Sequence, residues 1–380
     1  MSSIQDVFLQ AQFAEAAYAN FINPSTGSIY GTQAGLQGAL EASGFSTAQA
    51  SEFVQHWKVK DQVNNSVLGV VGSGFSATIF ENLDNPGQYS LAIRGSQGVN
   101  DFLVDYALIT NQGVAVSQVV DLYNFWIRAQ TPAGASYTPA VLEPAIGTSS
   151  NLIFIGGIGY AVKKVDSSQL SDTAMQTGSG VFASTPSSID VSGHSLGGHL
   201  AMAFTRLFPN ANAISVNGLG FKLDNSNVTN LFSQLAGSTS FSYSSIQNVY
   251  GIAGYEFAAM NNGVLQQPGA YDGIFIESAG LGASLGHSAL QMTDSLAVYD
   301  LFAKVDPSLN DLIANPNALR TITGILTASS STAANSLESA VSALGSLLRT
   351  QNFVAPTGSA YDTDRNALAV NDETIMQEVA

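Results

Sequence analysis

The stretch VSGHSLGGH at 191–199 constrains the fold of this chain more than any other. It holds the pattern Gly-x-Ser-x-Gly centred on Ser195, between a strand-like run and a helix-like run at 200–208. Strand, tight turn and helix form the context in which this pattern presents a strained serine as a nucleophile. We therefore predict an open Ser195 hydroxyl, with the N–H of Leu196 directed at a developing oxyanion. The alternative, a glycine-rich turn without chemistry, is disfavoured by the doubled glycine and the apolar flanks.

The composition excludes several classes of function. The chain has 380 residues, a net charge of −16 and no cysteine. The charge disfavours nucleic acid and anionic membranes as partners, and the lack of cysteine excludes disulfides, thiolate metal sites and cysteine nucleophiles. The first residues lack the basic and apolar regions of a cleavable signal, and no apolar run is long enough to span a membrane. We expect an extracellular location without such a signal, a cytoplasmic one being the alternative, and no required cofactor.

Hydrophobic periodicity predicts an α/β fold with a mostly parallel central sheet, because strands and helices alternate from 189 to 302. An antiparallel beginning is expected from strand-like runs before residue 94, one of them at 67–71. Loosely patterned residues 131–186 form an insertion before the nucleophile strand, either a lid or a buried strand with a loop. The expected organisation is a catalytic domain over 1–305, a helical extension packed on it over 306–355, and a polar tail over 356–380.

A serine hydroxyl needs a base, and the chain offers four histidines. His56 is expected at the surface or in a sheet. The side chain of His194 is expected to diverge from the serine at the turn, and His199 to pack or to bond a neighbouring loop. His287 remains, in a loop between the last predicted strand and a helix, where a catalytic histidine belongs. We therefore predict His287 as the base.

The acid of a serine–histidine–acid triad should lie between the serine and the histidine. Glu256 is favoured because it follows the predicted strand at 245–251 by a few residues. Asp272 precedes the predicted strand at 273–277 and so should sit at the wrong end of the sheet, and Glu277 lies at the end of that strand. Asp224 begins a polar turn and is expected to cap the next helix. Asp272 and Asp224 stay open as alternatives.

The second oxyanion donor is expected from the loop after an early central strand. Gly95 would let the backbone approach closely, and Ser96 could offer both an N–H and a hydroxyl. A plain strand end with Arg94 paired to Asp101 or Asp105 is the alternative, and both can hold together.

Three segments carry a family resemblance. Residues 193–198 resemble the nucleophile elbow of bacterial lipases, and residues 92–105 resemble the strand and oxyanion loop of class 3 lipases. Residues 287–299 are similar to the catalytic-histidine segment of secreted proteobacterial lipases, which often carry calcium-binding repeats of the repeat-in-toxin type. The resemblance covers residues 75–305. The chain departs from that family because it has no Gly-Gly-x-Gly-x-Asp repeat, so it is either a short natural form or the catalytic domain of a longer protein.

The resemblance implies an α/β-hydrolase that cleaves carboxylic esters through Ser195, His287 and Glu256, with Leu196 and Ser96 in the oxyanion hole. Acylglycerols are the expected substrates, reached through transient contact with a lipid interface, and calcium is considered only as a structural ion. A soluble-ester esterase and a phospholipase A1 are the enzymatic alternatives. A non-catalytic exported surface protein on a hydrolase scaffold is the alternative from another class. The sequence leaves the oligomeric state open.

Overall fold

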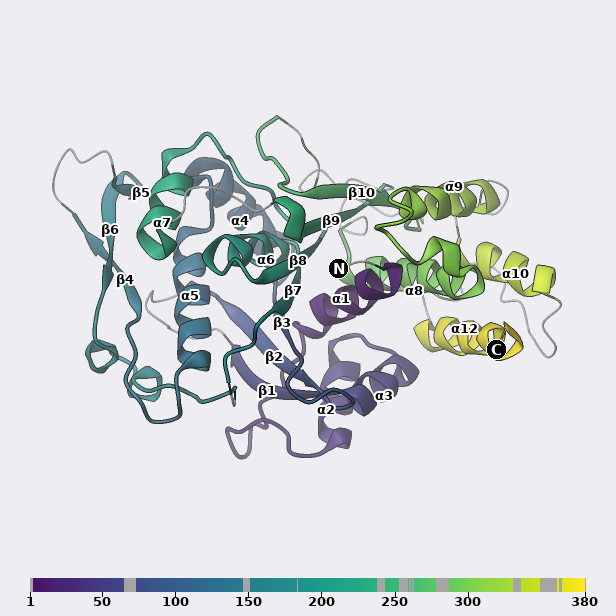
Figure 1. Ribbon diagram of the computed structural model, residues 1–380, viewed down its shortest axis with the longest axis horizontal. Coiled ribbons are helices and arrows are strands. Elements are labelled where there is room, and N and C mark those ends of the chain that lie inside the picture. The colour runs from purple at the N-terminus through teal and green to yellow at the C-terminus, as the bar shows by residue number, and fades with distance from the viewer. Residues whose placement is uncertain are drawn as a thin grey trace.

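A seven-stranded sheet runs through the centre of the molecule in this computed structural model (Figure 1). The spatial order is β1 (Trp57–Asn64), β2 (Ser76–Asn82), β3 (Tyr89–Ile93), β7 (Ile189–His194), β8 (Ala211–Val216), β9 (Ile246–Gly251) and β10 (Ala270–Ile274). The pairs β1–β2 and β2–β3 are antiparallel, and every pair from β3 to β10 is parallel. The carboxyl ends of β3 and β7 therefore meet at the same edge of the sheet.

The structure describes most of the chain. The described residues are 3–64, 73–145, 151–182, 184–237, 243–252, 259, 261, 263–277, 287–330, 336–348, 361 and 364–379. The strand expected at 67–71 lies outside them.

Helices cover both faces of the sheet, as its parallel part requires. One face packs against α5 (Val116–Gln130), α6 (Leu196–Leu207) and α7 (Ser226–Ala236), and the other against α1 (Ile4–Ala16), α2 (Gln33–Ser43), α3 (Thr47–His56) and α8 (Ala289–Val305). Side chains of β3 show the alternation: Leu91 and Ile93 belong to the core with α5 and α6, whereas Ala92 belongs to the core with α2 and α3. The helix α4 (Val99–Gln112) follows β3.

The insertion expected at 131–186 contains a second, three-stranded antiparallel sheet. Its order is β4 (Ala140–Pro144), β6 (Ile158–Lys164) and β5 (Ile153–Ile155). The small sheet packs beside α5 and α7 at one end of the molecule (Figure 1). Short 3₁₀ turns at Ser167–Gln169 and Thr173–Met175 follow it, and two more lie at Tyr243–Ser245 and Pro307–Leu309.

The C-terminal region forms helices at the opposite end of the molecule, α9 (Ala318–Ser330), α10 (Leu337–Leu348) and α12 (Arg365–Val379) (Figure 1). The helical extension expected at 306–355 agrees with α9 and α10. The tail expected at 356–380 does not match α12, which packs on α3, α8 and α10. One of the charged residues of α12, Arg365, binds Asp294 on α8 and Glu15 on α1.

The fold is α/β, as predicted, with a mostly parallel central sheet, an insertion before β7 and C-terminal helices. Within the described ranges, no helix is both long and apolar enough to cross a membrane.

Candidate active site

The turn between β7 and α6 holds Ser195 in a strained backbone conformation. Its φ is 59° and its ψ is −124°, a region that residues with a Cβ rarely adopt. The neighbouring glycines make this turn sterically feasible. A Cβ on Gly193 would lie 2.2 Å from the backbone carbon of Gly197, and a Cβ on Gly197 would lie 2.1 Å from the carbonyl oxygen of Ile93. Strand, turn and helix thus approach as closely as the Gly-x-Ser-x-Gly pattern predicted.

The structure brings together Ser195 and His287, which are 92 positions apart in the sequence. Oγ of Ser195 lies 2.7 Å from Nε2 of His287, which precedes the N-cap of α8, Ser288. The prediction of an open serine was wrong, because Ser195 is only 2% exposed. Phe102 on α4 packs against His287 with ring centroids 4.6 Å apart, so α4 covers the pair.

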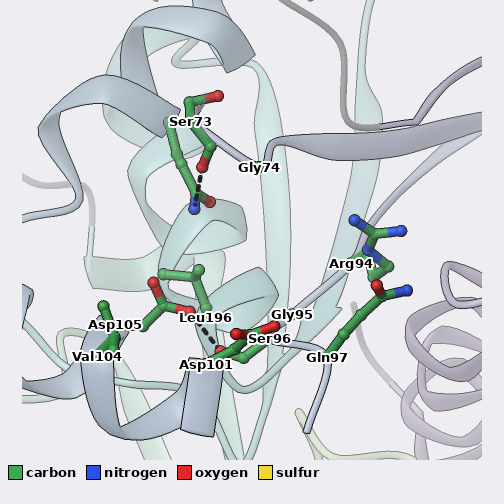
Figure 2. Close-up of a pocket in the computed structure, with 11 residues that line it drawn as sticks. Ser73, Gly74, Arg94, Gly95, Ser96, Gln97, Asp101, Val104, Asp105 and Leu196 are labelled. Atoms are coloured by element: carbon green, nitrogen blue, oxygen red, sulfur yellow. Dashed lines mark hydrogen bonds between the residues drawn. The ribbon is translucent and has the colours of Figure 1, made fainter. Parts of the chain in front are cut away.

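The loop after β3 lies directly beside the turn of Ser195, since β3 and β7 are paired. A Cβ on Gly95 would be 2.3 Å from the carbonyl oxygen of His194, so only glycine permits this approach. The hydroxyl of Ser96 donates a 2.6 Å hydrogen bond to Oδ2 of Asp105 on α4, as Figure 2 shows. Burial raises the pKa of the Asp105 carboxyl, and the bond from Ser96 opposes that rise.

The N–H of Leu196 belongs to the first turn of α6, where N–H groups have no partner within the helix. Arg94 donates from Nη1 to Oδ1 of Asn64 at 2.7 Å. Burial lowers the pKa of the Arg94 guanidinium and the charge of Asp101, one of its two expected partners, opposes that lowering, whereas Asp105 accepts from Ser96.

A mostly polar cavity of about 250 Å³ adjoins this loop (Figure 2). Leu196 and Ser96 both line it, so a group bound there would lie beside the expected oxyanion donors. Arg94, Asp101 and Asp105 contribute the charged part of its wall.

Glu256, the acid predicted from the sequence, lies outside the described residues. Two of the other candidate carboxylates, Asp272 and Glu277, have structural partners. Asp272 lies inside β10 rather than before it, because that strand begins at Ala270, and its oxygens accept from Gln247 and Arg320. Glu277 accepts from the N–H of Leu337, at the start of α10.

The expectation that Asp224 caps the following helix was wrong. The N-cap of α7 is its neighbour Asn225, whose side chain accepts from the N–H of Asn227. The polar turn that suggested a cap was identified correctly, but the cap lies one residue further along the chain.

Each of the three remaining histidines has hydrogen-bond partners of its own. His199 is buried between the carbonyls of Leu219 and Gly220 and the N–H of Ala115, and burial lowers its pKa to about 4. His56 lies on the surface. The side chain of His194 points toward the loop of the predicted base: its Nε2 lies 2.6 Å from the carbonyl oxygen of His287. Sequence reasoning missed this contact because the strained turn after His194 sets the direction of its side chain.

Among the described residues, no group of three or more histidine, aspartate or glutamate side chains is arranged to hold a metal ion.

Solved structures that match this chain include two lipases. No family model matches the sequence, and no curated protein matches it. The crystal structure of M37 lipase aligns with 65% of this chain and 67% of its own, at 13% identity and a TM-score of 0.28. Lip2 lipase from Yarrowia lipolytica aligns with 72% of this chain and 79% of its own, at 12% identity and a TM-score of 0.32. Both TM-scores are too low for either match to say anything about activity.

Proposed function

We propose that this protein is a serine hydrolase of carboxylic esters, with acylglycerols as its substrate class. The observation that carries the proposal is the 2.7 Å contact between Oγ of Ser195 and Nε2 of His287. Two further features support it: the strained backbone of Ser195, and the loop of Ser96 beside the nucleophile turn. A weak hydroxyl nucleophile within hydrogen-bond distance of an imidazole base is the arrangement that acyl transfer requires.

The proposed reaction has two stages. His287 accepts the proton of Ser195 as the hydroxyl oxygen attacks the ester carbonyl, and the oxyanion receives hydrogen bonds from the N–H groups of Leu196 and Ser96. His287 then passes the proton to the departing alcohol, leaving an acyl-serine. In the second stage His287 deprotonates a water molecule as its oxygen attacks the acyl group, and His287 then returns that proton to the departing Oγ of Ser195, which releases the acid.

Glu256 remains our proposed triad acid, on its position after β9. Its carboxylate would hold the His287 tautomer and stabilise the imidazolium. No cofactor is required for this chemistry, since the nucleophile, base and oxyanion donors are all supplied by the chain.

A lipid substrate is proposed because of the element that covers the site. The helix α4 contacts His287 through Phe102 and bonds Ser96 through Asp105, whereas its Leu103 and Val104 are 52% and 64% exposed. Movement of α4 at a lipid surface would bury these two side chains and uncover the serine. The segment 131–186, the lid suggested by sequence, is bonded to α7 in this structure, so α4 is the better candidate.

The proposal is tested first by covalent labelling. A fluorophosphonate should attach to Ser195 of the wild type and not to Ser195→Ala, and that substitution should lower kcat by about 10⁶ if the residues act as a unit. An unlabelled wild type would instead support the non-catalytic surface protein. A loss of only a few-fold in Ser195→Ala would end the assignment of the nucleophile.

The substrate class is tested with purified wild type on soluble p-nitrophenyl butyrate and on emulsified long-chain triglyceride. A lipase should show a sharp rise in rate once its substrate aggregates. Equal or higher activity on the soluble ester, without such a rise, would favour the esterase. A phospholipid as the best substrate would favour the phospholipase A1.

A further inference from the structure

His194 directly precedes the proposed nucleophile, yet its side chain reaches the loop of the proposed base. Its Nε2 lies 2.6 Å from the backbone carbonyl oxygen of His287, and the two imidazole rings are 4.8 Å apart. His194 is 6% exposed, so this contact is shielded from solvent. Because a carbonyl oxygen only accepts, Nε2 of His194 must carry the proton of this hydrogen bond.

A third residue fixes that tautomer from the other side of the ring. The hydroxyl of Tyr18, just after α1, lies 2.9 Å from Nδ1 of His194. Burial raises the pKa of the Tyr18 phenol, so the phenol keeps its proton and donates it to Nδ1. The same hydroxyl lies against the backbone of Gly95, in the loop after β3. Tyr18 therefore links that loop to His194, and His194 links the nucleophile turn to His287.

The electrostatic state of His194 suits a positioning role. Burial, together with the neighbouring His287, lowers the pKa of its imidazole well below the ordinary value, so the ring stays neutral at pH 7. A second positive charge this near would oppose the imidazolium that forms on the base during acyl transfer. A neutral donor can hold the backbone of His287 without that penalty.

We propose that His194 is a positioning residue of the hydrolytic reaction: its Nε2–H holds the carbonyl of His287, in the tautomer set by Tyr18, so that the base stays within reach of Ser195. This inference rests on the proposed function. It differs from a role in core packing, because it depends on one N–H donor and not on the volume of the ring.

Two substitutions of His194 separate the donor from the volume. His194→Phe keeps a flat ring and removes the donor, whereas His194→Gln places an amide N–H at the position of Nε2. We expect kcat on p-nitrophenyl butyrate to fall by about 10²-fold in the phenylalanine variant, since a small misplacement of a catalytic group costs this much. KM should change little, and the glutamine variant should recover most of the loss. His56→Phe, a surface histidine on α3, is the matched control and should retain wild-type kinetics.

The kinetic measurements distinguish failure of this inference from failure of the proposed function. Wild-type kcat in His194→Phe would overturn the inference. So would equal losses in both His194 variants at equal melting temperature, because the donor would then be irrelevant. Failure of the proposed function would show in the wild type itself, as no ester hydrolysis and no fluorophosphonate label on Ser195.

The tautomer can be measured without activity. In ¹⁵N-histidine-labelled protein, the His194 signals are identified by their loss in His194→Gln. They should report a neutral ring with the proton on Nε2 at every pH at which the protein stays folded, and Tyr18→Phe should perturb Nδ1. A neutral ring that carries its proton on Nδ1 would refute the hydrogen bond to His287, and a ring that titrates near the ordinary histidine pKa would refute the neutral donor.

Discussion

Single residues around Ser195 are fixed by the space left between backbones. Gly193, Gly197 and Gly95 each lie where an added Cβ would come within 2.1–2.3 Å of a backbone atom. These contacts join β3, β7 and α6 at one point, and backbone atoms cannot move aside as the end of a side chain can. The geometry of the proposed active site therefore depends on the absence of a side chain at these three glycines.

The first prediction concerns Gly197. Gly197→Ala should cost about 3 kcal/mol of stability, because overpacking against the Ile93 carbonyl forces a backbone shift. It should also abolish ester hydrolysis, because that shift separates the oxyanion loop from the nucleophile. Urea unfolding and kcat measure the two effects.

The control for this substitution is Gly38→Ala on the exposed face of α2, where an added Cβ meets no atom within 4 Å. It should stabilise the protein by about 0.5–1 kcal/mol, because alanine favours the helix. Similar effects at both glycines would show that the contact with Ile93 is not limiting.

At the scale of elements, the insertion is held to the main domain by amide side chains. Asn227 on α7 accepts from the N–H of Phe154 at 2.7 Å and donates to its carbonyl at 2.9 Å. Gln234 on the same helix accepts from the N–H of Val162 at 2.8 Å. These bonds satisfy backbone groups of β5 and β6 as a further strand would. These hydrogen bonds hold the small sheet against α7, whereas a lid must be free to move away from the site.

The second prediction tests this fastening. Asn227→Leu leaves two backbone groups of Phe154 without their partner and should cost about 1–3 kcal/mol locally. Limited proteolysis should therefore cut faster within residues 151–164, while hydrolysis of a soluble ester stays as in the wild type. Gln37→Leu, at an exposed amide on α2, is the control and should change neither. If faster cleavage at 151–164 came with a large change in activity, residues 131–186 would instead be the better candidate for the lid.

Short sequence motifs predicted the parts of this structure that depend on residues close together in the chain. Ser195 followed from a nine-residue pattern, and His287 followed by elimination among four histidines. The partner of Asn227, the direction of His194 and the docking of α12 depend on contacts between residues far apart in sequence, which no periodicity reveals. Asp272 was misplaced because its strand begins three residues earlier than the apolar run suggested.

At the scale of the whole molecule, one guanidinium joins the two ends of the described chain. Arg365 on α12 donates to both carboxylate oxygens of Glu15 on α1 and to those of Asp294 on α8, and it also reaches the carbonyl of Gly44. Two buried carboxylates thus share a single cation. Burial raises the pKa of Asp294 to about 6, although Arg365 acts to lower it.

The last prediction follows from this shared charge. Arg365→Met keeps the aliphatic part of the side chain and leaves Glu15 and Asp294 buried without their cation, so it should cost about 3–5 kcal/mol. Without Arg365 the pKa of Asp294 rises further above its unfolded value. The folded variant then holds a proton that the unfolded chain releases, and its stability falls as pH rises.

The loss should accordingly be larger at pH 8 than at pH 5, as measured by urea unfolding of variant and wild type at both values. Arg320→Met is the matched control, because Arg320 is 68% exposed in its ion pair with Asp272. Its removal should cost less than about 1 kcal/mol. If the Arg365 variant lost equal stability at both pH values, the carboxylates would not be taking up a proton in the folded state. The cation would then stabilise α12 through packing and its bond to the Gly44 carbonyl, because charge compensation alone predicts the dependence on pH.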